Sequence, residues 1–101
     1  MKRKVTQLPK KDILKLKKLL PLWSLNKKET EITRTYAAST HIDALVLIAR
    51  ITVHAQVLNH HPEILFTYAK LKIVLTTHDV QGLTKLDVDL AKQIDVVLAR
   101  G

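Results

Sequence analysis

Histidine is the residue type with the clearest chemical potential in this sequence of 101 residues. The chain carries His41, His54, His60, His61 and His78. Imidazole exchanges protons near neutral pH, so several histidines that converge on one ligand suit general acid–base catalysis. The adjacent pair and the single residue at position 78 are the candidates. From the residues alone, acid–base chemistry, a metal site and ordinary surface histidines all stay open.

Metal and covalent chemistry have weaker support. The chain has no cysteine, which excludes a disulfide framework, a thiolate nucleophile and a cysteine zinc or iron–sulfur centre. No two histidines stand at i and i+4 with a glutamate between them, as a helical zinc site would require. The two serines, Ser24 and Ser39, lie in no nucleophile motif. We therefore predict no metal site.

The elements that position these histidines follow from apolar spacing. A basic amphipathic helix is predicted at about 9–20, opening near Pro9, with lysines in water and apolar residues on the core. The segments 22–25 and 31–36 flank a polar turn and predict a hairpin. The apolar residues of the helix predicted at about 9–20 are Ile13, Leu16, Leu19 and Leu20.

A long helix is predicted from Ser39 or Thr40 to about Leu58. Asp43 suits its first turn, where the helix dipole favours an acid. Several β-branched residues weaken its intrinsic helicity, so packing must hold it. The apolar residues at helical spacing are Ile42, Leu45, Val46, Ala49, Val53 and Val57.

One or two strands are predicted between Phe66 and Thr77. In the second half, Leu71, Ile73 and Leu75 alternate with residues of the other face. Gly82 then breaks the pattern. Thr84 with Asp87 has the spacing of a variant capping box, which introduces a last helix through about Leu98.

This order, α-β-β-α-β-β-α, predicts an α+β fold with a four-stranded antiparallel sheet and helices packed on one face. The composition, 47% hydrophobic and 26% charged, is that of one globular domain over residues 1–101. No apolar run is long enough to cross a bilayer, and no segment resembles a signal peptide. We expect a cytoplasmic protein.

The net charge of +8 is concentrated at the N-terminus. The first 18 residues hold eight lysine or arginine residues against one aspartate, while the remainder is nearly neutral. Binding to nucleic acid or to an anionic membrane therefore rests on this segment alone. No aromatic stacking platform, zinc-finger spacing or glycine-rich phosphate loop accompanies it. We predict neither a nucleic-acid nor a membrane partner, and keep basic surface binding as a third possibility.

An ordered set of motifs carries a family resemblance. The segment Asn59-His60-His61-Pro62-Glu63 is followed by Tyr68, by Leu75-Thr76-Thr77-His78-Asp79, by Gly82-Leu83-Thr84 and by Asp87. From about Trp23 to Ile94 the sequence closely resembles the pterin-4a-carbinolamine dehydratase family, also known as the dimerisation cofactor of a homeodomain transcription factor.

The resemblance implies an enzyme, a 4a-hydroxytetrahydrobiopterin dehydratase. It would eliminate water from a 4a-hydroxytetrahydropterin to give the quinonoid dihydropterin, in tetrahydrobiopterin recycling, without consuming a cofactor. By position, His60, His61 and His78 would be catalytic, with Asp87 supporting them. The residues that would bind the pterin are His60, His61, Pro62, Thr77, His78, Asp79 and Val80.

The sequence does not allocate the proton-transfer roles. We take His60 and His61 as acid candidates and His78 as the base or an orienting partner. Asp87 would cap the last helix or orient the site. Tyr68 is expected to pack rather than to react.

Two positions depart from the family pattern, and one alternative function stays open. Gln56 stands where a charged residue is usual, and Ile64 stands where an aromatic residue is common. The alternative is a non-catalytic protein-binding scaffold or transcriptional coactivator of the same fold. The resemblance also implies a homodimer or homotetramer, built through the long helix and sheet edges, and allows a further protein partner.

Overall fold

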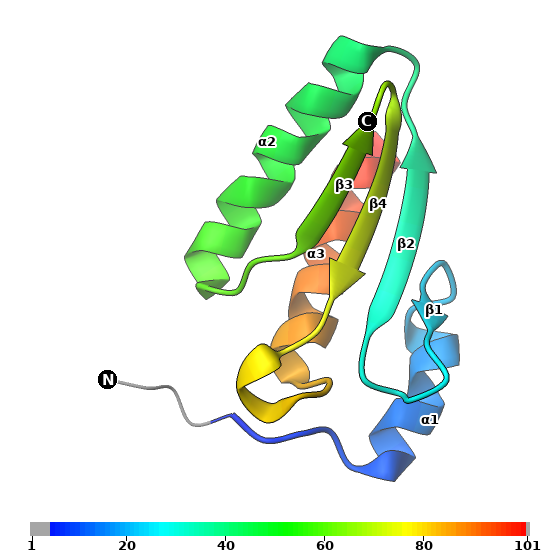
Figure 1. The fold of residues 1–101 in the computed structure, drawn as a ribbon, viewed down its shortest axis with the longest axis vertical. Helices are drawn as coiled ribbons and strands as arrows, with labels where there is room; N and C mark the ends of the chain where they lie inside the picture. The colour runs from blue at the N-terminus through cyan, green and yellow to red at the C-terminus, as the bar shows by residue number, and fades with distance from the viewer. Residues whose placement is uncertain (1–4, 101) are drawn as a thin grey trace.

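The computed structural model describes residues 5–100 and has the predicted order of helices and strands (Figure 1). A single 3₁₀ turn, η1 (His78–Val80), separates the last strand from the last helix. The predicted fold class is confirmed. The elements are α1 (Lys10–Leu19), β1 (Ser24–Leu25), β2 (Ile32–Ala37), α2 (His41–Leu58), β3 (Glu63–Thr67), β4 (Lys70–Leu75) and α3 (Lys85–Arg100).

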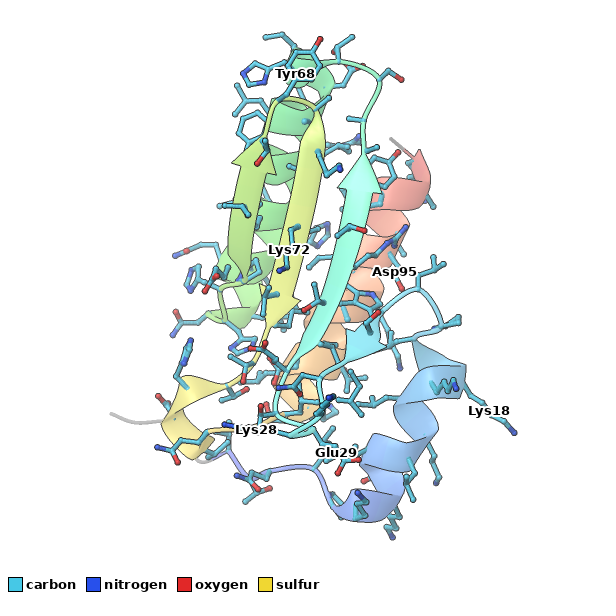
Figure 2. The ribbon with its side chains drawn as sticks, turned by 45° about the vertical axis from the view of Figure 1, so that its right-hand side comes forward. Lys18, Lys28, Glu29, Tyr68, Lys72 and Asp95 are labelled. Carbon is cyan, nitrogen blue, oxygen red and sulfur yellow. The ribbon has the colours of Figure 1, made fainter. Side chains whose placement is uncertain are left out.

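The four strands form one antiparallel sheet in the order β1-β2-β4-β3. Side chains alternate between its two faces, as the pattern of β4 predicts. Leu71, Ile73 and Leu75 are fully buried on the inner face, while Lys72 is exposed on the outer face (Figure 2). The alternation places the core on one side of the sheet only.

Helices α2 and α3 both lie on that inner face (Figures 1 and 2). Thr40 caps α2, because its Oγ1 accepts the backbone N–H of Asp43 at 3.0 Å. Asn59 ends the helix with a left-handed backbone, φ 49°. The buried side chains of α2 recur at helical spacing on one stripe: Ala44, Leu47, Ile51 and Ala55.

The opposite face of α2 is apolar and uncovered. With 18 residues and a mean hydropathy of 1.4, α2 is long and apolar enough to span a membrane. Core helices of soluble proteins often share both properties. The apolar residues whose spacing predicts the helix are exposed, and a different set of its residues is buried. The exposed residues, called the outer α2 stripe below, are Ile42, Leu45, Val46, Ala49, Val53 and Val57.

Tyr68, which is expected to pack rather than to react, packs at the surface and not in the core. Tyr68 lies in the two-residue turn between β3 and β4, with φ 52°, and its side chain is 76% exposed. Tight hairpin turns need positive φ, and their side chains point away from the sheet. His41 stacks beside Tyr68, with ring centroids 6.0 Å apart, and hydrogen-bonds its carbonyl at 2.5 Å.

The N-terminal helix packs at the β1 edge of the sheet (Figure 1). Leu16 and Leu20 join the core and the lysines of α1 face solvent, as predicted. Leu19 is half exposed, against the expected pattern, because the chain turns away after it. Before the helix, the backbone N–H of Leu8 donates to the carbonyl oxygen of Leu83 at 2.8 Å. This hydrogen bond connects the segment to the loop before α3.

Candidate active site

A buried carboxylate lies at the centre of the candidate site. Asp87 has no exposed surface. Its Oδ2 accepts the Thr77 hydroxyl at 2.7 Å and the backbone N–H of Thr84 at 2.9 Å. Its Oδ1 lies 2.6 Å from Nε2 of His60. Three donors from separate segments thus compensate for the loss of water around this group.

The start of α3 explains why the carboxylate stands there. Thr84 precedes the first helical residue, and its Oγ1 accepts the backbone N–H of Leu86 at 3.2 Å. Asp87 reaches back to the N–H of Thr84, which is the reciprocal contact of a capping box. Asp87 therefore caps α3 through Oδ2, as predicted, and contacts His60 through Oδ1; its role in orienting a catalytic site stays a prediction.

Thr77 connects β4 to this network. It is buried, and its Oγ1 lies 2.8 Å from that of Thr84 as well as contacting Asp87. A β-bridge between Thr77 and Gly82 closes the loop that contains η1. Of the residues predicted to border a pterin, Thr77 is thus the one whose hydroxyl is already fully engaged within the protein.

The orientation of His60 follows from its two neighbours in the fold. After the left-handed turn at Asn59, the N–H of His60 donates to the carbonyl of Ala55 at 3.0 Å, and the ring is buried against α3. A carboxylate only accepts hydrogen bonds, so Nε2 of His60 carries the hydrogen in the bond to Asp87.

The second ring nitrogen of His60 is available. Among residues 5–100, no residue forms a hydrogen bond with Nδ1, whereas every buried side-chain nitrogen or oxygen has a hydrogen-bond partner. Nδ1 therefore reaches the surface as an acceptor. This is the arrangement in which a carboxylate selects one histidine tautomer and leaves the other nitrogen free to take a proton.

His61 turns away from its neighbour. It is exposed, and its Nε2 lies 3.1 Å from the amide oxygen of Gln56 in the last turn of α2. Gln56, one of the two departures from the family pattern, therefore contacts this histidine without adding charge. Ile64, the other departure, is half buried on the inner face of β3 opposite Ile73.

The turn η1 lies next to the loop between α2 and β3 (Figures 1 and 2). His78 and Asp79 are exposed on it, and Val80 is half buried. Hydrogen bonds therefore connect His60 and Thr77 to Asp87. His61, Pro62 and η1 lie on the two loops beside this group. Over residues 5–100, no hydrogen bond or ring contact joins His78 to either of the other two histidines.

Two residues that support the site or its loops are not predicted as such from the sequence. Thr84 was predicted only as a helix cap, although its contact with Thr77 completes the support of Asp87. Gln7 donates from its side-chain amide to the carbonyl of Val80 at 2.5 Å and so holds η1. No local signal could reveal a contact between residues 73 positions apart.

No group of three or more metal-binding side chains converges among residues 5–100. The fold and site therefore define a class: a small α+β domain with a buried His–Asp pair, flanked by two loops that carry exposed histidines.

Comparison with known proteins gives this class a family. The family model described as pterin 4 alpha carbinolamine dehydratase matches residues 6–97. A Rhizobium johnstonii protein named as a pterin-4-alpha-carbinolamine dehydratase is 37% identical over 79 residues, covering 78% of each chain. One of the same name from Nostoc punctiforme is 37% identical over 90 residues, covering 89% of this chain and 95% of its own.

A solved structure agrees with these relatives. The Brucella melitensis protein described as a transcriptional coactivator/pterin dehydratase superposes with a TM-score of 0.86 at 25% identity, covering 92% of this chain and 99% of its own. This chain belongs to the pterin-4a-carbinolamine dehydratase family.

Removal of the Asp87 carboxylate should destabilise the whole domain. We expect Asp87→Ala to lower the free energy of unfolding by about 3 kcal/mol, because it leaves the N–H of Thr84 and the ring of His60 buried without a partner. Urea denaturation measures the change. Asp89→Ala, on the same helix but half exposed, is the control and should cost less than about 0.5 kcal/mol. Equal losses for both variants would contradict the central place of Asp87.

Proposed function

We propose that this protein eliminates water from a 4a-hydroxytetrahydropterin and releases the quinonoid dihydropterin. Family membership supports the substrate class. The observation that carries the proposal is the His60–Asp87 pair, which keeps a proton acceptor fixed beside two loops with further histidines. Substrate and product differ by one molecule of water, so the reaction needs no redox partner. We infer a cytoplasmic setting, as the sequence predicts.

The elimination needs two proton transfers. The C4a–O bond breaks as a protonated imidazole donates to the departing hydroxyl, which leaves as water. A neutral imidazole takes the proton from a ring nitrogen, and the electron pair of that N–H bond forms the new C=N bond. Each transfer commonly contributes about 10² to 10⁴ in rate.

The geometry favours His60 as the base. Its Nε2–H is committed to Asp87, so Nδ1 is the nitrogen that can accept a proton. As Nδ1 takes the proton, the adjacent carboxylate stabilises the charge that forms. Sequence reasoning had grouped His60 with the acids, and this proposal moves it to the other role.

His61 and His78 are then the acid candidates. Both are exposed, so each can be reprotonated from water between turnovers. They lie on the two loops that would enclose the pterin, together with Pro62, Asp79 and Val80. Thr77 supports the site indirectly, because its hydroxyl donates a hydrogen bond to Asp87.

Single histidine variants test the function. In a stopped-flow dehydration assay, His60→Ala should lower kcat by about 10² or more because it removes the base, and at least one of His61→Ala and His78→Ala should do the same because it removes the acid. His54→Ala, on α2 and outside this network, should keep wild-type activity and serves as the control. Full activity in all three site variants would overturn the assignment. Wild-type protein without measurable dehydration would overturn the enzyme proposal and favour the non-catalytic scaffold.

We also propose that the protein forms a homo-oligomer through the outer α2 stripe and the edge of β3. The stripe is apolar along the whole helix, and Val53 and Val57 are 63% and 81% exposed. β3 is an edge strand with unpaired backbone groups, and Leu65 on it is 62% exposed. An exposed apolar stripe and an open strand edge are both typical of subunit interfaces. A protein partner, as in the coactivator scaffold, would use the same stripe.

A charge on the stripe should separate the subunits. We expect Val53→Asp to shift the protein from oligomer to monomer at micromolar concentration, because the carboxylate would be buried without a partner in the interface. Light scattering measures the mass. Val96→Asp, at an exposed position of α3, is the matched control and should leave the mass unchanged. A wild-type monomer would contradict the proposal.

A further inference from the structure

A groove between α1 and the β1–β2 hairpin has no role in the chemistry proposed above. Its volume is about 550 Å³, which is in the range of ligand-binding sites. It lies at the far edge of the sheet from the His60 loop (Figure 1). The residues that line it are Ile13, Leu14, Leu16, Lys17, Leu20, Pro21, Trp23, Ser24, Leu25 and Ile32.

The apolar floor of the groove is held rigidly. Leu16, Leu20 and Ile32 belong to the core. Trp23 is fixed because its indole N–H donates to Oδ1 of Asp95 at 2.8 Å, and the same oxygen accepts a hydrogen bond from Arg34. The floor therefore needs no rearrangement to receive apolar groups.

The rim of the groove remains exposed. Leu14 is 66% exposed on α1, and Leu25 is 38% exposed on β1. Leucines exposed around a concave apolar surface are typical of a site that is covered by another molecule.

Lysines surround these leucines. Lys17 lines the groove itself, and Lys18 extends into solvent from the same helix (Figure 2). Over residues 5–100, neither Lys17 nor Lys18 forms an ion pair, whereas Lys10 pairs with Glu29. Within the described part of this segment, residues 5–18 hold five lysines and one aspartate, so positive charge is in excess on α1. An occupant must therefore bring negative charge together with apolar groups.

This charge argues against the occupants that the chain itself offers. A second copy docked groove to groove would place lysines against lysines, and the chain's first residues are themselves basic. A flat bilayer fits poorly on a concave surface whose deepest residues, Leu16 and Trp23, are buried. A convex, narrow occupant fits better.

We propose that the groove binds an amphipathic helix of an acidic partner protein. Its apolar residues would insert between α1 and the hairpin, and its carboxylates would pair with Lys17 and Lys18. This is the usual mode by which a groove recognises a helix, with apolar anchors at i, i+3, i+4 and i+7. The proposal does not depend on the dehydratase activity.

A synthetic peptide tests the proposal on the full chain. The probe is a helix of about 18 residues with leucines on one face and glutamates on the other. Trp23 is the only tryptophan, so its emission reports groove occupancy directly. We expect saturable binding with a Kd of about 10 to 100 μM, a shift of Trp23 emission, and weaker binding at high salt. The same peptide with lysine in place of every glutamate should not bind.

Two variants locate the site. Leu14→Glu should weaken peptide binding at least about tenfold, and Lys17→Glu about fivefold, because they introduce repulsion at the rim. Both positions are exposed, so the fold should be retained and circular dichroism checks this. Lys72→Glu makes the same charge change on the open face of the sheet (Figure 2) and should leave binding unchanged.

Three results would overturn the proposal. Equal affinity for the acidic and the basic peptide would remove charge recognition. Equal weakening by Lys17→Glu and Lys72→Glu would show that only net charge matters. A shift of Trp23 emission with vesicles of anionic phospholipid, but not with the acidic peptide, would assign the surface to a membrane instead.

Discussion

The carboxylate of Asp87 is buried, no lysine or arginine among residues 5–100 pairs with it, and it is stable there because three donors surround it. Those donors come from the α2–β3 loop, the end of β4 and the start of α3. A buried carboxylate that lost these bonds would be strongly destabilising, so the three segments must meet for the chain to fold. The same bonds hold His60 in one tautomer. The hydrogen bonds of Asp87 therefore both stabilise the fold and orient the proposed base.

The sequence predicts the fold well where periodicity decides it. Leu71, Ile73 and Leu75 alternate, and they form the inner face of β4. The site is predicted less completely, because its geometry depends on contacts between distant segments. Residue type identifies His60 and His61 together, yet a left-handed turn at Asn59 buries one and exposes the other. Spacing alone also could not show that the two oxygens of Asp87 take separate roles.

The outer α2 stripe and the α1 groove are both apolar and uncovered over residues 5–100, and their charges distinguish them. The outer α2 stripe carries little charge among its valines and leucines, which suits a second copy of the same chain. The α1 groove is bordered by lysines, which repels a second copy and suits an acidic partner. Hydrophobic periodicity could predict that α2 is a helix, but not which of its faces meets the sheet, since both faces are apolar. That choice depends on the fit of Ala44, Leu47 and Ile51 against the strands.

The most direct test of this account is the tautomer of His60, which nitrogen-15 NMR of the histidine rings can measure in the free protein near neutral pH. We expect that hydrogen resides on Nε2, that Nδ1 carries no hydrogen, and that addition of a pterin perturbs the Nδ1 resonance. A His60 ring with hydrogen on Nδ1, or an even mixture of the two tautomers that a pterin leaves unchanged, would contradict it.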